Sequence, residues 1–152
     1  MKIKKLLFFI IITFIIATTP SIFVNTASSY DNFIKPDIYP PSYLFPVIWS
    51  LLYLIMAISI YIISETKTYK NKTKSYILYF SQLIVNSLWT IIYFSLNLKL
   101  LGIIWIILLI ILVILMLLEF FKINKISTYI NIPYLLWLSY ALILSIQIYN
   151  LN

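Results

Sequence analysis

The sequence of 152 residues contains no cysteine, no histidine and no arginine. Without cysteine and histidine, the chain has no disulfides and no thiolate nucleophile, and it lacks the ligands of most zinc sites and the commonest haem ligand. Acidic residues number only four, and no carboxylate pair suggests acid–base catalysis. We therefore predict no conventional catalysis, no metal site and no resident cofactor.

Hydrophobic residues are abundant instead: they make up 63% of the chain, whereas charged residues make up 10%. Soluble domains are close to half apolar, and a membrane-spanning helix needs about 20 apolar residues. Five such runs predict an all-α, polytopic membrane protein, in which a bundle of five transmembrane helices forms a single domain over residues 1–152. The helices are predicted at about 6–24, 44–63, 76–96, 100–121 and 130–149.

The first apolar run follows Lys2, Lys4 and Lys5, a pattern that is also typical of a secretory signal peptide. The run is long enough to span a membrane, and the nearest candidate cleavage site, residues 25–27, has an asparagine where a small residue is required. We therefore interpret the first run as a retained helix.

All eleven basic residues are lysines, and their distribution is uneven. If five helices alternate across a membrane, every lysine except Lys35 and Lys99 lies on the same side as residue 1. The positive-inside rule then predicts a multi-pass cell-membrane protein with a cytoplasmic N-terminus and a C-terminus outside. Nothing resembles a nucleic-acid module, so the lipid membrane is the partner that this charge pattern predicts.

The stretch from Pro40 to Met56 joins a rigid diproline to an apolar helix, on which Trp49 and Tyr53 lie one turn apart. Residues four apart share a helix face. This arrangement could form the mouth of a pocket for a flat apolar ligand, with residues 30–43 as a loop that caps it. An aromatic belt at the membrane interface is the alternative, and we also expect Trp105 to belong to such a belt.

The third predicted helix carries a polar and aromatic stripe of Gln82, Asn86, Trp89 and Tyr93, with spacings of four, three and four residues. An amide exposed to lipid is costly unless it is hydrogen-bonded, so the stripe should face inward. We expect Gln82 to join helices by hydrogen bonding; Asn86 could do the same or could contact a ligand.

The fifth predicted helix has a similar stripe, in which Trp137, Ala141 and Ser145 lie four residues apart. At a rise of about 1.5 Å per residue, this stripe, Trp49 and the stripe of the third helix all lie between the middle of the membrane and the side of the 30–43 loop. If they converge, they line one aromatic cavity that opens toward that loop.

Three segments in this order resemble the TspO/MBR family, the translocator proteins or tryptophan-rich sensory proteins, which are also described as peripheral-type benzodiazepine receptors. They are PPSYLFPVIWSLLYLIMA, QLIVNSLWTIIYF and PYLLWLSYALILS. The resemblance implies a five-helix membrane protein that binds porphyrins and synthetic isoquinoline-type ligands in a cavity within the bundle. It also implies a homodimer, and for some members the light-dependent degradation of protoporphyrin by tryptophans of the pocket.

The residues that match the family pattern and the stripes above give the predicted ligand site. Its members are Tyr43, Phe45, Trp49, Tyr53, Asn86, Trp89, Tyr93, Trp137, Ala141 and Ser145. If the protein is photochemical, Trp49 and Trp137 are the redox-active residues. The sequence departs from the family pattern at Tyr43, Pro46, Val47, Trp105 and Ser145.

Three functions follow as hypotheses. The first is a membrane protein that binds a porphyrin or haem and has a sensory or regulatory role; because histidine is absent, we expect metal-free porphyrin to bind at least as well as haem. The second is light-driven porphyrin degradation. The third is a small transporter or a scaffold for hydrophobic molecules, in which the lysine-rich segment 67–74 contacts a partner or anionic lipid.

Overall fold

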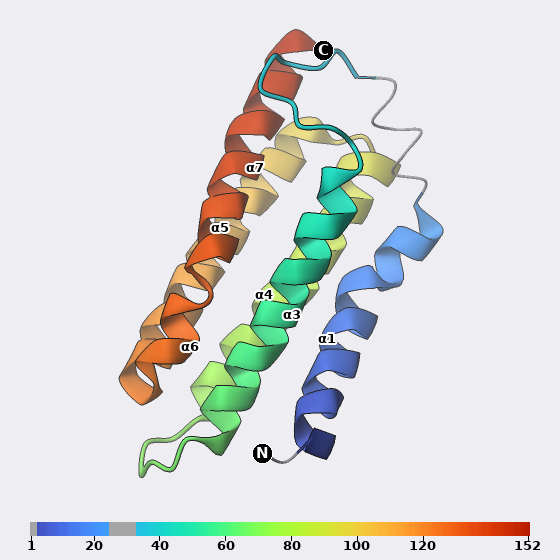
Figure 1. Cartoon of the computed structure of the whole chain (residues 1–152). Coiled ribbons are helices and arrows are strands. Elements are labelled where there is room, and N and C mark those ends of the chain that lie inside the picture. Colours follow the sequence, from blue (N-terminus) through green and yellow to red (C-terminus); the bar gives the residue numbers. More distant parts are fainter. Residues whose placement is uncertain (1–2, 25–32) are drawn as a thin grey trace.

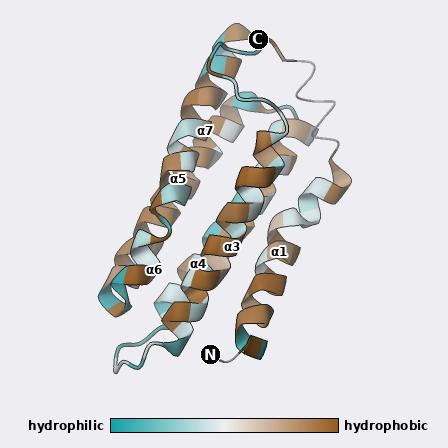
Figure 2. Ribbon diagram, viewed as in Figure 1, coloured by the Kyte–Doolittle hydropathy of each residue, from teal (hydrophilic) through white to brown (hydrophobic). Residues whose placement is uncertain are grey.

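The computed structural model describes residues 3–24 and 33–152, and its helices lie side by side in one elongated bundle (Figure 1). Within these residues, five helical segments are long and apolar enough to span a membrane, which confirms the predicted all-α membrane fold. Hydrophobic residues extend along the helices, while the loop that joins α3 to α4 is hydrophilic (Figure 2). The elements are α1 (Ile3–Phe23), α3 (Leu44–Glu65), α4 (Thr73–Thr90), η1 (Ile91–Ser95), α5 (Lys99–Ile123), α6 (Lys125–Tyr129) and α7 (Ile132–Leu151).

The last predicted helix, about 130–149, is preceded in the structure by the short α6. The side chain of Asn124 accepts a hydrogen bond from the amide of Ile126 at 3.0 Å, so it caps α6 at its first turn. Pro133 lies in the first turn of α7, where an amide donor is not needed. Asn124 thus marks the start of α6 and Pro133 the start of α7, and the short α6 itself was not predicted from the apolar pattern.

The third predicted helix, about 76–96, is regular only to Thr90 and ends in the π-helical turn η1. Within this turn, the amide of Leu96 donates to the carbonyl of Ile91 at 3.0 Å. Asn97 follows with a positive φ of 52°, a conformation that asparagine tolerates better than most residues. The wider turn shifts the register of Tyr93 and Phe94 relative to the rest of α4.

Two tryptophans join α4 and α5 by reciprocal hydrogen bonds. The indole nitrogen of Trp89 on α4 donates to the carbonyl of Gly102 at 3.2 Å, and that of Trp105 on α5 donates to the carbonyl of Val85 at 2.8 Å. The place of Trp105 in an interfacial belt stays a prediction, while its bond between two helices is a role that the sequence did not predict. An indole N–H in apolar surroundings is stabilised when it finds an acceptor, and the backbone of α4 provides one.

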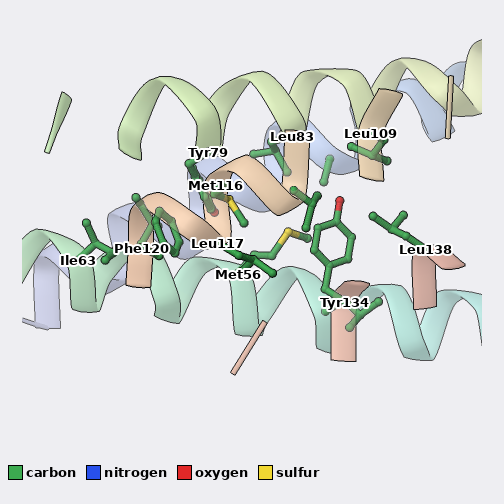
Figure 3. Packing of buried hydrophobic residues seen from close by; sticks show 14 of the residues in the cluster. Met56, Ile63, Tyr79, Leu83, Leu109, Met116, Leu117, Phe120, Tyr134 and Leu138 are labelled. Carbon is green, nitrogen blue, oxygen red and sulfur yellow. The ribbon is translucent and has the colours of Figure 1, made fainter. Parts of the chain in front are cut away.

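Large apolar side chains of α3, α4, α5 and α7 fill the centre of the bundle (Figure 3). Among them is Tyr134, which is fully buried and tethers α7 to α4. Its hydroxyl donates to Oε1 of Gln82 at 2.8 Å and accepts from Nδ2 of Asn86 at 3.0 Å. The predicted interhelical role of Gln82 is thus confirmed, and Asn86 shares it.

The first helix packs against α3 and α4 through a face of Phe9, Thr13, Ala17 and Pro20, all of which are buried. The hydroxyl groups of Thr13 and Tyr79 are hydrogen-bonded at 2.6 Å. Nearer the end of α1, the hydroxyl of Ser87 on α4 donates to the carbonyl of Ile16 at 2.8 Å. Helix α1 is therefore packed into the bundle as one of its helices. The candidate cleavage site at 25–27 lies outside the described residues.

Lysines gather at the end of the bundle where α3 and α5 finish and α4 begins, here called the lysine-rich end. Glu119 pairs there with Lys74 at 2.8 Å and with Lys122 at 2.7 Å, and Lys5 pairs with Glu65 at 2.7 Å. Other lysines at this end donate to carbonyls in the last turns of α3 and α5, where a positive charge is favoured by the helix dipole. The opposite end, which carries residues 33–43, is called the loop end.

Gly102 allows the tightest contact between α5 and the π-helical turn, and we expect Gly102→Ala to destabilise the protein. A Cβ at this position would lie 2.6 Å from Cδ2 of Tyr93, which is only 1% exposed, so a buried ring would have to shift. Overpacking of this kind costs about 1–3 kcal/mol, so the melting temperature in detergent should fall. The control is Leu100→Ala on the exposed face of the same helix; equal melting temperatures for both variants would contradict the prediction.

Candidate functional site

A cavity of about 350 Å³ lies between α1, α3 and α4 toward the loop end. We call it the larger cavity, in comparison with the small chamber described below; an open hollow of about 570 Å³ lies at the surface beside Leu98, Lys99 and Tyr149. Aromatic rings of α3, α4 and η1 line it, together with hydroxyl and amide groups. Its volume is near the lower limit of typical small-molecule sites, which run from about 300 to 1,000 Å³. The lining residues are Ala17, Thr18, Ser21, Ser42, Phe45, Pro46, Trp49, Ser50, Tyr53, Asn86, Trp89, Thr90 and Phe94.

Several hydroxyl groups of the larger cavity give their protons to their own helix. Thr18 donates to the carbonyl of Phe14 at 2.7 Å, and Ser50 donates to the carbonyl of Pro46 at 2.7 Å. A serine or threonine oxygen that has donated its proton still has lone pairs to accept with. These groups therefore offer hydrogen-bond acceptors to whatever occupies the cavity.

Asn86 adds an amide oxygen to the same wall. The Tyr134 hydroxyl gives its proton to Gln82, so it can only accept from Asn86, and this fixes Nδ2 of Asn86 toward Tyr134. Its Oδ1 receives no hydrogen bond from the described residues, while the residue lines the larger cavity. The network thus orients an acceptor toward the cavity.

A second space of about 20 Å³, the small chamber, lies between α3, α7 and the end of α4 with η1. The predicted stripe of Trp137, Ala141 and Ser145 forms its α7 side. Phe45, Trp49 and Trp89 line both the small chamber and the larger cavity, so their rings form the wall between the two. The remaining lining residues of the small chamber are Tyr93, Leu144 and Ile148.

Ring contacts explain why the predicted single cavity is divided. The centroid of the Trp49 ring lies 6.5 Å from that of Trp137 and 6.4 Å from that of Tyr134, both in edge-on geometry. Phe45 contacts Trp137 in the same way at 6.0 Å. On the other side, Trp89 stacks on Tyr93 at 4.8 Å. The rings that were expected to surround one space instead fill much of it.

The structure therefore distributes the ten sequence-predicted residues between two spaces, with one exception. Tyr53 and Asn86 face the larger cavity, and the α7 residues with Tyr93 face the small chamber. Tyr43 lines neither, because it precedes α3 as its N-cap residue and its side chain is 69% exposed.

Helix α1 contributes Ala17, Thr18 and Ser21 to the larger cavity, and sequence reasoning missed this. Thr13, Ala17 and Ser21 are small or hydroxyl residues four apart, and the run up to residue 16 is otherwise bulky and apolar. Small residues on one face let helices approach closely, so this spacing was the available signal.

The described part of the predicted first loop, residues 33–43, is fastened mainly over α7. The backbone of Ile34 exchanges two hydrogen bonds with the Asn152 side-chain amide, at 2.9 and 3.1 Å. The hydroxyl of Tyr140 donates to the carbonyl of Ile38 at 2.6 Å, and the Phe33 ring contacts Tyr93. Of this part of the loop, Ser42 is the residue that lines the larger cavity; residues 30–32 lie outside the described range.

Lys35 and Lys99, the two lysines predicted on the side opposite residue 1, lie over aromatic rings of the loop end. The Nζ atom of Lys99 is 4.3 Å from the Phe33 ring centroid, and that of Lys35 is 5.4 Å from the Tyr39 ring centroid. Both distances are typical of cation–π contacts. Neither lysine lines the larger cavity, so pairing with a bound carboxylate would require either one to leave its ring.

The pattern of the TspO/MBR family matches residues 8–151. The tryptophan-rich protein TspO of Archaeoglobus fulgidus is 36% identical over 100% of this chain and 99% of its own length, and that of Chlorobaculum tepidum is 32% identical over 81% of this chain and 78% of its own length. The tryptophan-rich sensory protein of Cereibacter sphaeroides is 25% identical over 81% of this chain and 76% of its own length. With its aromatic motifs placed on apolar helices around a cavity, this chain belongs to the TspO/MBR family.

Proposed function

We propose that the protein binds porphyrin-type and isoquinoline-type hydrophobic ligands in the larger cavity and has a sensory or regulatory role. The observation that carries the proposal is a cavity of about 350 Å³ walled by the rings of Phe45, Trp49, Tyr53, Trp89 and Phe94, with a few polar groups between them. This is the usual composition of a small-molecule site, in which apolar surface supplies affinity and few polar groups fix orientation. The name of the Cereibacter sphaeroides relative supports the sensory role.

Isoquinoline-type ligands and tetrapyrroles differ in how well their size fits the larger cavity. An isoquinoline-type ligand is comparable to the drug-sized molecules that such cavities hold. A tetrapyrrole is larger, and we propose that it enters the larger cavity by one edge while the Phe45 and Trp49 rings move toward the small chamber. Metal-free porphyrin and haem are both candidate ligands.

We also propose how the protein is oriented in the membrane and that it forms a homodimer. By the positive-inside rule, the lysine-rich end is cytoplasmic and the loop end lies outside, so the larger cavity is near the outer face of a cell membrane. A homodimer is proposed on family grounds alone.

Binding is tested by titrating the purified protein with protoporphyrin while porphyrin absorbance and tryptophan fluorescence are followed. We expect saturable binding, and we expect Trp49→Ala to raise Kd by about ten-fold, which corresponds to about 1.4 kcal/mol of lost ring contact. The control is Leu108→Ala on the exposed face of α5, which should leave Kd unchanged. Non-saturating signals that are identical in all three proteins would mean that porphyrin only partitions into detergent.

Light-dependent porphyrin degradation is the second candidate, and the contact between Trp49 and Trp137 favours it. Trp49 lines the larger cavity, whereas Trp137 lies behind it with the two ring centroids 6.5 Å apart. An excited porphyrin in the larger cavity would therefore meet Trp49 first and would reach Trp137 only through it.

Bleaching of bound protoporphyrin under illumination tests this candidate. At saturating ligand, we expect Trp49→Phe to slow bleaching several-fold and Trp137→Phe to slow it less, because of these two tryptophans Trp49 lines the larger cavity and Trp137 does not. Tyr129→Phe at the lysine-rich end serves as the control. If both tryptophan variants bleach porphyrin at the wild-type rate, the protein is a binder and not a photocatalyst.

A further inference from the structure

Three lysine side chains converge on one small area of the lysine-rich end, where α5 finishes and α4 begins. The Nζ atoms of Lys74 and Lys122 lie 2.8 and 2.7 Å from the same oxygen, Oε1 of Glu119. Beside them, Nζ of Lys70 donates to the carbonyl of Lys122 at 2.5 Å. Three positive charges are thus held next to one negative charge, and we call these four residues the lysine cluster.

The lysine cluster has donors and charge left for a further partner. An ammonium group has three donors, and the side chains of Lys74 and Lys122 are 67% and 57% exposed. Glu119 is only 16% exposed, and it holds both ammonium groups in place. In the part of the chain that the structure describes, Glu65 is the other carboxylate at this end, and it pairs with Lys5. The excess positive charge of the cluster therefore faces outward, where an anion can reach it.

Exposed apolar side chains lie on the membrane side of the lysine cluster. On α4, Ile77 follows Lys74 by three residues, and on α5, Leu118 precedes Lys122 by four, so each lysine shares a helix face with an apolar residue. Since α4 begins at the lysine-rich end and α5 finishes there, both apolar residues lie about one turn deeper than the lysines. Ile77 and Leu118 are 59% and 55% exposed. Charge above and apolar surface below match a lipid, whereas a soluble phosphate would use the charge alone.

We propose that the lysine cluster binds the headgroup of an anionic phospholipid that carries two phosphate groups. The ammonium groups that Glu119 holds together, and Lys70 beside them, donate to phosphate oxygens, while an acyl chain follows Ile77 and Leu118 along α4 and α5. Hydrogen bonds between ammonium and phosphate groups are charge-assisted and strong, and basic pockets between spanning helices recognise such headgroups. The inference goes beyond the proposed function and needs no ligand in the larger cavity.

The test measures the melting temperature of the full chain in detergent as cardiolipin, a lipid with two phosphates, is added to the micelles. A ligand of the folded state raises this temperature in proportion to its occupancy, which gives an apparent Kd. We expect Lys74→Gln/Lys122→Gln to raise that Kd about 30-fold, from about 1 kcal/mol for each lysine. The matched control Lys4→Gln/Lys67→Gln removes the same charge from the same end outside the cluster and should raise it about three-fold or less, because charges away from the site are screened.

Two further additives identify the source of the phosphate. Phosphatidylglycerol, with one phosphate, should stabilise the wild-type protein at higher concentrations than cardiolipin does, and inorganic phosphate should not stabilise it. Equal stabilisation by the two lipids would overturn the two-phosphate preference, and stabilisation by inorganic phosphate would replace the lipid site with one for a soluble anion.

Equal losses of cardiolipin affinity in the two double variants would mean that the lysine-rich end attracts anionic lipid only as diffuse charge, and the lysine cluster would then be no site. Should the cluster variant fail to fold, Lys70→Gln is compared in the same way with Lys67→Gln. Both are single changes in the exposed segment before α4, and equal effects of the two would again exclude the site.

Discussion

The hydroxyl of Tyr134 is the interaction on which the rest of the site depends. A polar group in a membrane has no water to bond with, so each must find a partner inside the bundle. Tyr134 provides a hydrogen-bond partner for two buried side-chain amides, since it donates to Gln82 and accepts from Asn86. The same two bonds fix α7 against α4 and decide which atom of Asn86 faces the larger cavity.

Nearer the loop end, two indole hydrogen bonds fix α4 against α5. Trp89 on α4 donates to the carbonyl of Gly102, and Trp105 on α5 donates to the carbonyl of Val85, which holds the two helices in register. Because the absence of a Cβ at Gly102 leaves room for the Tyr93 ring, the π-helical turn can direct that ring toward the small chamber. Trp89 is thereby a fixed part of the wall between the two spaces, and its N–H is not available to a ligand.

The spanning helices and the buried polar face of α4 could be predicted from the sequence, because both depend on the spacing of residues along the chain. Apolar runs of about 20 residues predicted the spanning helices, and the four-residue spacing from Gln82 to Asn86 predicted an inward polar face, as observed. The division of the site was not predictable in this way, because it depends on how far the Trp49 and Trp137 rings fill the space between α3 and α7. The interhelical bond of Trp105 was not predictable either, because its acceptor is a backbone carbonyl, which leaves no trace in the sequence.

Polar groups on the walls constrain a ligand of the larger cavity in addition to its shape. In the larger cavity, Thr18 and Ser50 give their protons to helix carbonyls and Asn86 presents its Oδ1, so these three groups can accept hydrogen bonds. The hydroxyl of Tyr53 on the same wall still has a proton to donate. Under the proposed function, a ligand whose edge carries both N–H or O–H donors and acceptor oxygens matches this mixed wall. For haem the chain offers no histidine to bind the iron, so the metal would add nothing to the contacts that the macrocycle makes with the aromatic rings.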